Sequence, residues 1–227
     1  MEMTGAAAAP ARRGFGLPAL GGAAYAVLFV VGFGIGFADT PGGDDPPAKV
    51  IAYFADSGHR DNIDLGWILV LIGVFCLIWF LAALRRLLLG IDAGGQLTWV
   101  ASIGGTIYAA TTLVGISLEA AIYTMSDDTY HHQVYPSLIH FANDAGYVIH
   151  AAGGVGIGAL MIATSLAVAR AGLMARWIAI VGVVLGVLAL ASIFFFPLFG
   201  ILIWLIVASI ALFRTSAVVT PRGAPAV

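Results

Sequence analysis

The segment between Arg176 and Arg214 contains 37 consecutive residues without a charged side chain. One bilayer crossing by a helix needs about 20 predominantly apolar residues. The segment is therefore long enough for two crossings, and a proline near its middle ends a helix. We predict two helices joined by a tight turn near Phe196, Pro197 and Gly200, with the two flanking arginines on one side of the membrane.

The composition of the whole chain agrees with this reading. Hydrophobic residues make up 61% of its 227 positions, charged residues only 10%, and the mean hydropathy is +1.01. An ordinary soluble domain carries about 25% charged residues. The sequence predicts an all-α polytopic membrane bundle of six transmembrane helices within residues 17–214, flanked by disordered tails at 1–16 and 215–227. Besides the last pair, the predicted spans are 17–37, 63–84, 97–123 and 137–169.

The charged residues predict the orientation of the bundle. Positive residues collect on the cytoplasmic side of bacterial membranes. Placing the N-terminus inside puts most of the arginines on that side, namely Arg12, Arg13, Arg85, Arg86, Arg170, Arg176, Arg214 and Arg222. The two outer loops are then acidic, with Asp39, Asp44, Asp45, Asp56, Asp61, Asp64, Asp127 and Asp128. We expect a multi-pass protein of the plasma (inner) membrane with both termini cytoplasmic.

Residues 46–57 of the first outer loop have the pattern of a short amphipathic helix. Val50, Ile51 and Phe54 share one face, and such a helix lies against a membrane surface or against helix ends. We predict an N-cap at Asp45. The segment is either a surface anchor or a lid over a site, and the sequence leaves both interpretations open.

A stripe of polar side chains marks the outer part of the fourth predicted span. Residues three, four and seven apart share a helix face, so His140, Asn143, Asp144, Tyr147 and His150 lie along one side. The position of His150 is about 30 Å from Arg170 along a helix, and the position of Glu119 is about as far from Trp99. Because consecutive helices are usually neighbours, we expect Glu119 and His150 to lie at the same depth in the membrane on adjacent helices.

This coincidence predicts an outward-facing polar pocket between the third and fourth spans. Its ligand-binding residues would be Glu119, Asn143, Asp144, Tyr147 and His150. An ionisable group within the bilayer is costly and usually has a partner or a function.

Three interpretations of these residues stay open. In the first, Glu119, His140, Asp144 and His150 hold a divalent metal, and nitrogen and oxygen donors of this kind suit zinc. In the second, a glutamate and a histidine form a proton or small-ligand site. In the third, the polar residues satisfy one another at the outer interface and hold the two helices in register.

Glycines in three of the predicted spans form small-residue faces that allow helices to approach closely. They are Gly32, Gly34 and Gly36 in the first span, Gly153, Gly154, Gly156 and Gly158 in the fourth, and Gly182 and Gly186 in the fifth. These faces pack helices within the chain or within a homo- or hetero-oligomer, and they make the fourth span the expected centre of the bundle. A net charge of −2 offers no basic surface for nucleic acid. The single cysteine, Cys76, excludes an internal disulfide.

The chain also resembles a known group of proteins. The outer segment DDPPAKVIAYFADSGHRDNIDLGW, the LRRLL end of the second span and the stretch GLMARWIAIVGVVLGVLAL are similar to small bacterial, often actinobacterial, membrane proteins of unknown function. The resemblance implies a six-helix inner-membrane fold and carries no activity with it. Our expectation is a binding or accessory protein that holds a small ligand, lipid headgroup or ion. The alternatives are a metal-dependent intramembrane enzyme and a structural subunit of a larger membrane complex.

Overall fold

The computed structural model of the protein describes residues 15–42, 44–126 and 134–218. These residues form helices, and no strand occurs among them. In chain order the helices are η1 (Leu17–Leu20), α1 (Gly21–Gly36), α2 (Pro47–Ala55), α3 (Ser57–Ile91), α4 (Gln96–Ser126), α5 (Pro136–Arg170), α6 (Arg176–Leu188), η3 (Ala189–Phe194) and α7 (Pro197–Val218). Most of the two predicted tails lies outside the described residues, although α7 continues past residue 214.

Six helical segments are long and apolar enough to cross a membrane. This confirms the predicted all-α bundle of six spans and defines a multi-pass membrane protein. The predicted turn in the last uncharged segment is also confirmed, since η3 ends at Phe194 and α7 begins at Pro197. Between them Phe195 has a φ of 63°, a left-handed conformation that is unusual for a bulky residue.

The second span is longer than predicted. Its helix α3 covers 35 residues, or about 52 Å, against the roughly 30 Å of a hydrocarbon core. Asp56 caps its start by accepting a hydrogen bond from the Gly58 N–H at 2.7 Å. No proline interrupts it before the Gly94 and Gly95 pair, so the helix extends beyond the apolar part of its sequence at both ends.

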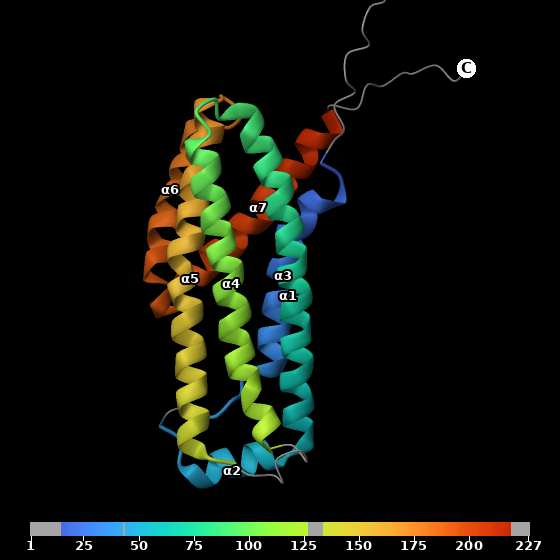
Figure 1. The fold of residues 1–227 in the computed structure, drawn as a ribbon, viewed down its shortest axis with the longest axis vertical. Helices are drawn as coiled ribbons and strands as arrows, with labels where there is room; N and C mark the ends of the chain where they lie inside the picture. The colour runs from blue at the N-terminus through green and yellow to red at the C-terminus, as the bar shows by residue number, and fades with distance from the viewer. Residues whose placement is uncertain (1–14, 43, 127–133, 219–227) are drawn as a thin grey trace, which may run out of the picture.

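Figure 1 shows how the helices are arranged. The long helices α3, α4 and α5 run nearly parallel, and α1 lies beside α3. The helix α2 lies across one end of α3, α4 and α5. We call this end of the bundle the acidic end. The helices α6 and α7 pack beside the half of the bundle that is farther from α2. At the end of that half, α3, α5 and α7 end and α6 begins. That opposite end carries Arg85, Arg86, Arg170, Arg176 and Arg214, and we call it the arginine end.

Glycines bring the backbones of α4 and α5 into direct contact. A Cβ atom placed on Gly156 would lie 2.6 Å from the carbonyl oxygen of Gly104, and one on Gly115 would lie 2.7 Å from that of Gly146. Across α5 and α6, a Cβ on Gly158 would lie 2.5 Å from the Gly186 oxygen. The α5 span is 67% buried, more than any other span, which confirms its predicted place at the centre of the bundle.

The glycines of α1 also pack within the chain, with one exception. A Cβ on Gly32 would lie 2.6 Å from the carbonyl oxygen of Gly66 in α3, and one on Gly36 would lie 3.0 Å from that of Asn62. Gly34 has open space around it instead. Most of the predicted glycine faces are therefore used between helices of the same chain.

The helix α2 is fixed to the ends of the long helices. Its Val50 and Phe54 are buried, and Arg60 of α3 donates to the carbonyl oxygens of Phe54 at 2.7 Å and Ala55 at 3.0 Å. The ring of His59 stacks on Tyr53 at 3.9 Å between centroids. These contacts tie both the apolar face and the C-terminal carbonyls of α2 in place, which fits a surface anchor better than a lid.

The prediction that Asp45 caps α2 is wrong. The N-cap residue is Pro46, and no side chain caps the helix. Asp45 instead accepts hydrogen bonds from Lys49 Nζ at 2.8 Å and from the Gly42 N–H at 2.9 Å. These two bonds, the Lys49 bond first, hold the pKa of the exposed Asp45 carboxyl below its ordinary value, with a smaller contribution from nearby His140.

The packing predicts opposite effects of one substitution at two glycines. Gly156→Ala should lower the free energy of unfolding by about 1–3 kcal/mol, since the new methyl group meets backbone atoms of α4 that cannot rotate away. Gly34→Ala should be neutral or stabilising by up to about 1 kcal/mol, since alanine favours the helix. Thermal unfolding of both variants in the same detergent measures the difference. Equal stability of the two variants would contradict this packing.

Candidate functional site

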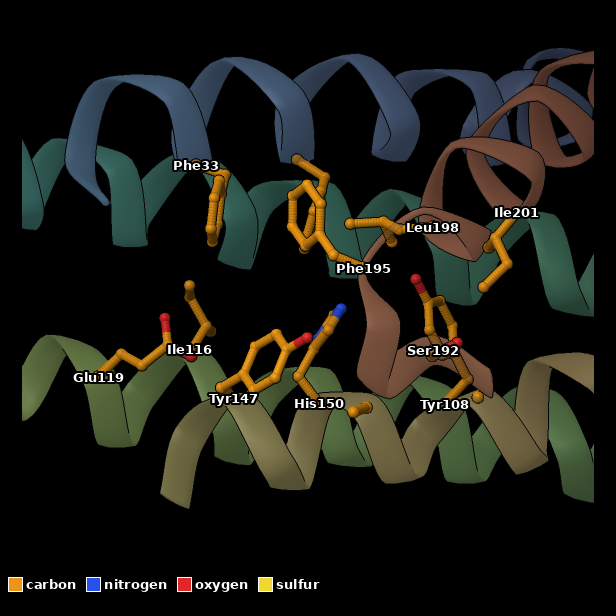
Figure 2. Close-up of a pocket in the computed structure, with 13 residues that line it drawn as sticks. Phe33, Tyr108, Ile116, Glu119, Tyr147, His150, Ser192, Phe195, Leu198 and Ile201 are labelled. Atoms are coloured by element: carbon orange, nitrogen blue, oxygen red, sulfur yellow. The ribbon is translucent and has the colours of Figure 1, made fainter. Parts of the chain in front are cut away.

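A cavity lies between α1, α4, α5 and the junction of η3 with α7 (Figure 2). The free space between its side chains is small, about 30 Å³. Aromatic and apolar side chains form most of its wall. The lining residues are Phe29, Phe33, Tyr108, Ile116, Glu119, Tyr147, His150, Ala151, Gly154, Ser192, Phe195, Leu198 and Ile201. Three of the residues predicted from the sequence, Glu119, Tyr147 and His150, thus line one cavity.

Glu119 of α4 is the one acidic side chain in the lining, and it is only 8% exposed. It fits against α5 because position 146 is a glycine: a Cβ there would lie 2.5 Å from Glu119 Cγ and 3.0 Å from its Oε1. Among the described residues its carboxylate has no hydrogen-bond or ion-pair partner. A buried carboxylate without a partner is costly, and a ligand with a positive charge would offset that cost.

His150 of α5 is held between aromatic rings. Its imidazole stacks on Phe29 of α1, with 5.3 Å between ring centroids and 19° between planes. It also lies 6.1 Å from the ring of Tyr108, at an angle of 56°. The backbone of His150 passes close to α4 because position 115 is a glycine. These contacts fix the ring in the wall of the cavity.

Tyr147 lies between these two ionisable residues. Figure 2 shows Glu119, Tyr147 and His150 in this order along the cavity. The Tyr147 hydroxyl donates a hydrogen bond to the carbonyl oxygen of Ile193 in η3, which joins α5 to the last turn before α7. Glu119 and His150 therefore line the same cavity, with Tyr147 between them.

Sequence reasoning missed two walls of the cavity. On α1, Phe29 and Phe33 stack with 6.0 Å between centroids. At the η3–α7 junction, the ring of Phe195 lies 6.2 Å from that of Phe33, and the left-handed backbone at Phe195 directs it there. The spacing of Phe29, Phe33 and Phe37 by four residues marks one aromatic face and could have identified the first wall. No sequence signal identified the second.

One lining residue of the cavity, Tyr108, belongs to a hydrogen-bonded pair of tyrosines. The Tyr108 hydroxyl of α4 and the Tyr25 hydroxyl of α1 are 2.9 Å apart, and either can donate. Both side chains are fully buried. Because a buried hydroxyl needs a partner, this pair holds α1 against α4 beside the cavity.

The remaining predicted site residues lie elsewhere. His140 and Asn143 are half-buried toward the acidic end, and His140 lies near Asp45 at the start of α2. Asp144 is exposed, because it is rotated by about 100° from Asn143 around the helix. The predicted stripe of α5 therefore divides, and only Tyr147 and His150 face the cavity.

The four predicted metal ligands do not come together. Glu119 and His150 line the cavity, whereas His140 and Asp144 lie outside it. Within the part of the chain that the structure describes, no group of three or more His, Cys, Asp and Glu side chains is placed to hold a metal ion. The nitrogen and oxygen donors that suggested zinc are thus spread over two helices, with Glu119 on α4 and the other three on α5.

Comparison with family models, with curated proteins and with solved structures finds no match for this chain. The resemblance to small bacterial membrane proteins therefore stays a prediction. The class of protein that the fold defines is a multi-pass α-helical membrane protein, and any more specific function must be argued from the cavity itself.

The bond between Tyr147 and Ile193 predicts a modest loss of stability on removal of one hydroxyl. Tyr147→Phe should lower the free energy of unfolding by about 0.5–1.5 kcal/mol, the net value of one hydrogen bond. Tyr53→Phe is the matched control, because the Tyr53 ring stacks on His59 and its hydroxyl forms no hydrogen bond among the described residues. Denaturation of both variants in one detergent tests this. A Tyr147→Phe protein as stable as the control would mean that η3 is not held by this bond.

Proposed function

We propose that the protein binds a small organic cation in the cavity between α1, α4, α5 and α7. The observation that carries this proposal is the buried, unpartnered carboxylate of Glu119 in a wall built largely of aromatic rings. A cation carrying apolar groups complements both features at once.

The aromatic rings support this choice of ligand. The faces of phenylalanine and tyrosine rings attract cations, and aromatic cages are a recurrent way to bind substituted ammonium groups. Phe29, Phe33, Tyr108, Tyr147 and Phe195 line the same cavity as Glu119. The carboxylate then supplies the opposite charge, whose attraction is strong where water is largely excluded. An anionic ligand would be repelled by Glu119, and a neutral ligand could offer it a hydrogen bond but no opposite charge.

The free space between the side chains of the cavity is small. Its volume of about 30 Å³ is below the roughly 300–1,000 Å³ of ligand pockets in general, so a ligand of the size of choline requires aromatic side chains of the wall to move aside. The arrangement gives less support to a metal-dependent enzyme, because the ligand set that such an enzyme requires does not converge. We therefore favour a binding or accessory protein over an intramembrane hydrolase.

We further propose that the acidic end faces outward from the plasma membrane and that both termini are cytoplasmic. The arginines at the ends of α3, α5 and α7 support this orientation through the preference of positive residues for the cytoplasmic side. The cavity lies in the half of the bundle nearer the acidic end and would then take its ligand from outside the cell.

Labelling with a membrane-impermeant maleimide tests the orientation. In a background with Cys76→Ser, a cysteine at Asp44 in the loop before α2 should react in intact cells. A cysteine at Ala93, between α3 and α4, should react only after the membrane is opened. The reverse pattern would show that the cavity opens to the cytoplasm.

Replacing the carboxylate tests the ligand. Wild-type protein should bind choline, and Glu119→Gln should weaken that binding by about 10- to 100-fold, which corresponds to the loss of one interaction with a charged group. Asp144→Asn is the matched control, since it removes an exposed carboxylate outside the cavity and should leave the affinity unchanged. Isothermal titration calorimetry of the detergent-purified proteins gives the three affinities.

A neutral ligand of the same shape completes this test. The compound 3,3-dimethyl-1-butanol replaces the ammonium nitrogen of choline by carbon. It should bind at least tenfold more weakly, because it carries no positive charge to pair with the carboxylate. Equal binding of the two compounds, or equal choline binding by wild type and Glu119→Gln, would reject a cation site at Glu119.

A further inference from the structure

A second hollow lies at the arginine end of the molecule, between α5 and α6. Its free volume is about 520 Å³, and it is open on one side. Two arginines and a set of apolar residues line it, namely Leu166, Ala169, Arg170, Arg176, Ala179, Ile180, Val183 and Val184. We call this feature the α5–α6 groove. It shares no residue with the cavity around Glu119.

The groove begins where the glycine contact between the two helices ends. Gly158 and Gly186 bring α5 and α6 together deep in the bundle. Toward the arginine end the chain must turn from one helix into the next, and Gly172 does so with a φ of 67°. The turn places the last residue of α5, Arg170, and the first residue of α6, Arg176, at the same end of the groove.

The two guanidinium groups have no acidic partner. Arg170 and Arg176 are exposed, and within the described residues neither forms an ion pair. Asp92 is the described acidic residue of this end, and its carboxylate accepts hydrogen bonds from the Thr98 N–H at 2.8 Å and the Thr98 hydroxyl at 3.1 Å. The groove thus presents two uncompensated positive charges at one end.

The rest of the groove is apolar and faces outward. Ile180 is 62% exposed and Val184 is 51% exposed. From Arg176 to Val184 the helix rises by about 12 Å, most of the roughly 15 Å depth of one hydrocarbon leaflet. The neighbouring Trp177 is 67% exposed, as suits a residue at the boundary between headgroups and hydrocarbon.

We propose that the α5–α6 groove is a binding site for one anionic phospholipid. Arg170 and Arg176 would hold its phosphate, to which guanidinium groups bind in a bidentate manner, and one acyl chain would lie along Ile180 and Val184. Basic pockets between transmembrane helices bind anionic headgroups in this way. A separate hollow of about 190 Å³ on the other side of α6 has no charged lining residue, and so nothing there selects a headgroup.

Native mass spectrometry of the full chain tests the site. The detergent-purified protein is titrated with phosphatidylglycerol or with phosphatidylcholine of the same acyl chains, and the affinity for the first bound lipid is measured. Phosphatidylglycerol should bind more tightly. The double variant Arg170→Gln/Arg176→Gln should lose about 10- to 30-fold of that affinity, as expected for two basic residues near an anionic headgroup.

A matched variant separates a defined site from general surface charge. Arg85→Gln/Arg214→Gln removes the same charge from the same end but from residues outside the groove, and it should leave the affinity for phosphatidylglycerol within about twofold. Equal losses in the two double variants would overturn the proposal. So would equal binding of the two lipids by the wild-type protein.

Two further measurements test the lipid itself. Val184→Trp fills the apolar part of the groove without changing charge, and it should weaken phosphatidylglycerol binding while Arg170 and Arg176 are intact. Unchanged binding would show that no acyl chain lies there. Glycerol 3-phosphate carries the headgroup phosphate without acyl chains and should not displace the lipid at equal concentration. If it did, the groove would be a site for soluble phosphates and the lipid assignment would fail.

Discussion

The direct backbone contact between α4 and α5 is the interaction on which the rest of the structure depends. Lipid tails are as apolar as leucine, so burial of apolar surface does little to hold helices together inside a bilayer. Close packing must do this instead, and glycines at Gly104, Gly115, Gly146 and Gly156 make it possible. Glu119 lies one turn from Gly115 on α4, and His150 one turn from Gly146 on α5. The contact therefore brings the two ionisable residues to one cavity.

The close contact between α4 and α5 has an energetic cost, which is the desolvation of Glu119. A carboxylate pressed against the backbone of α5 loses water without gaining a protein partner among the described residues, which opposes folding. The surroundings offset that cost through interactions that need no charge: the paired hydroxyls of Tyr25 and Tyr108, the stack of His150 on Phe29, and the tie from Tyr147 to η3. In the proposed function, a bound cation would offset the remaining cost of this carboxylate.

The features of the fold that the sequence predicted correctly are those that depend on local residue patterns and on the thickness of the membrane. Apolar length located six spans, proline located the last turn, and glycine spacing identified α5 as the centre. The division of the polar stripe was not predicted, because the spacing of His140, Asn143 and Asp144 does not say where the cavity ends along the helix. The walls from α1 and η3 were missed for a related reason. Chain order suggests that consecutive helices are neighbours, but it does not reveal that the first and last spans close the same space. The length of α3 was underestimated because hydropathy marks the membrane and not the end of a helix.

The positions of the two proposed sites follow from the length of α5, which contributes residues to both. His150 and Arg170 are separated by about 30 Å along the helix, the thickness of a hydrocarbon core, so one site lies near each membrane surface. Between them α5 is held by glycine contacts to α4 on one side and to α6 on the other, and packed backbones of this kind resist small displacements. A ligand at the acidic end would therefore be accommodated by side chains and by the Phe195 turn and not by movement of α5. The same rigidity gives the groove at the arginine end a fixed shape, which a site for one particular lipid requires.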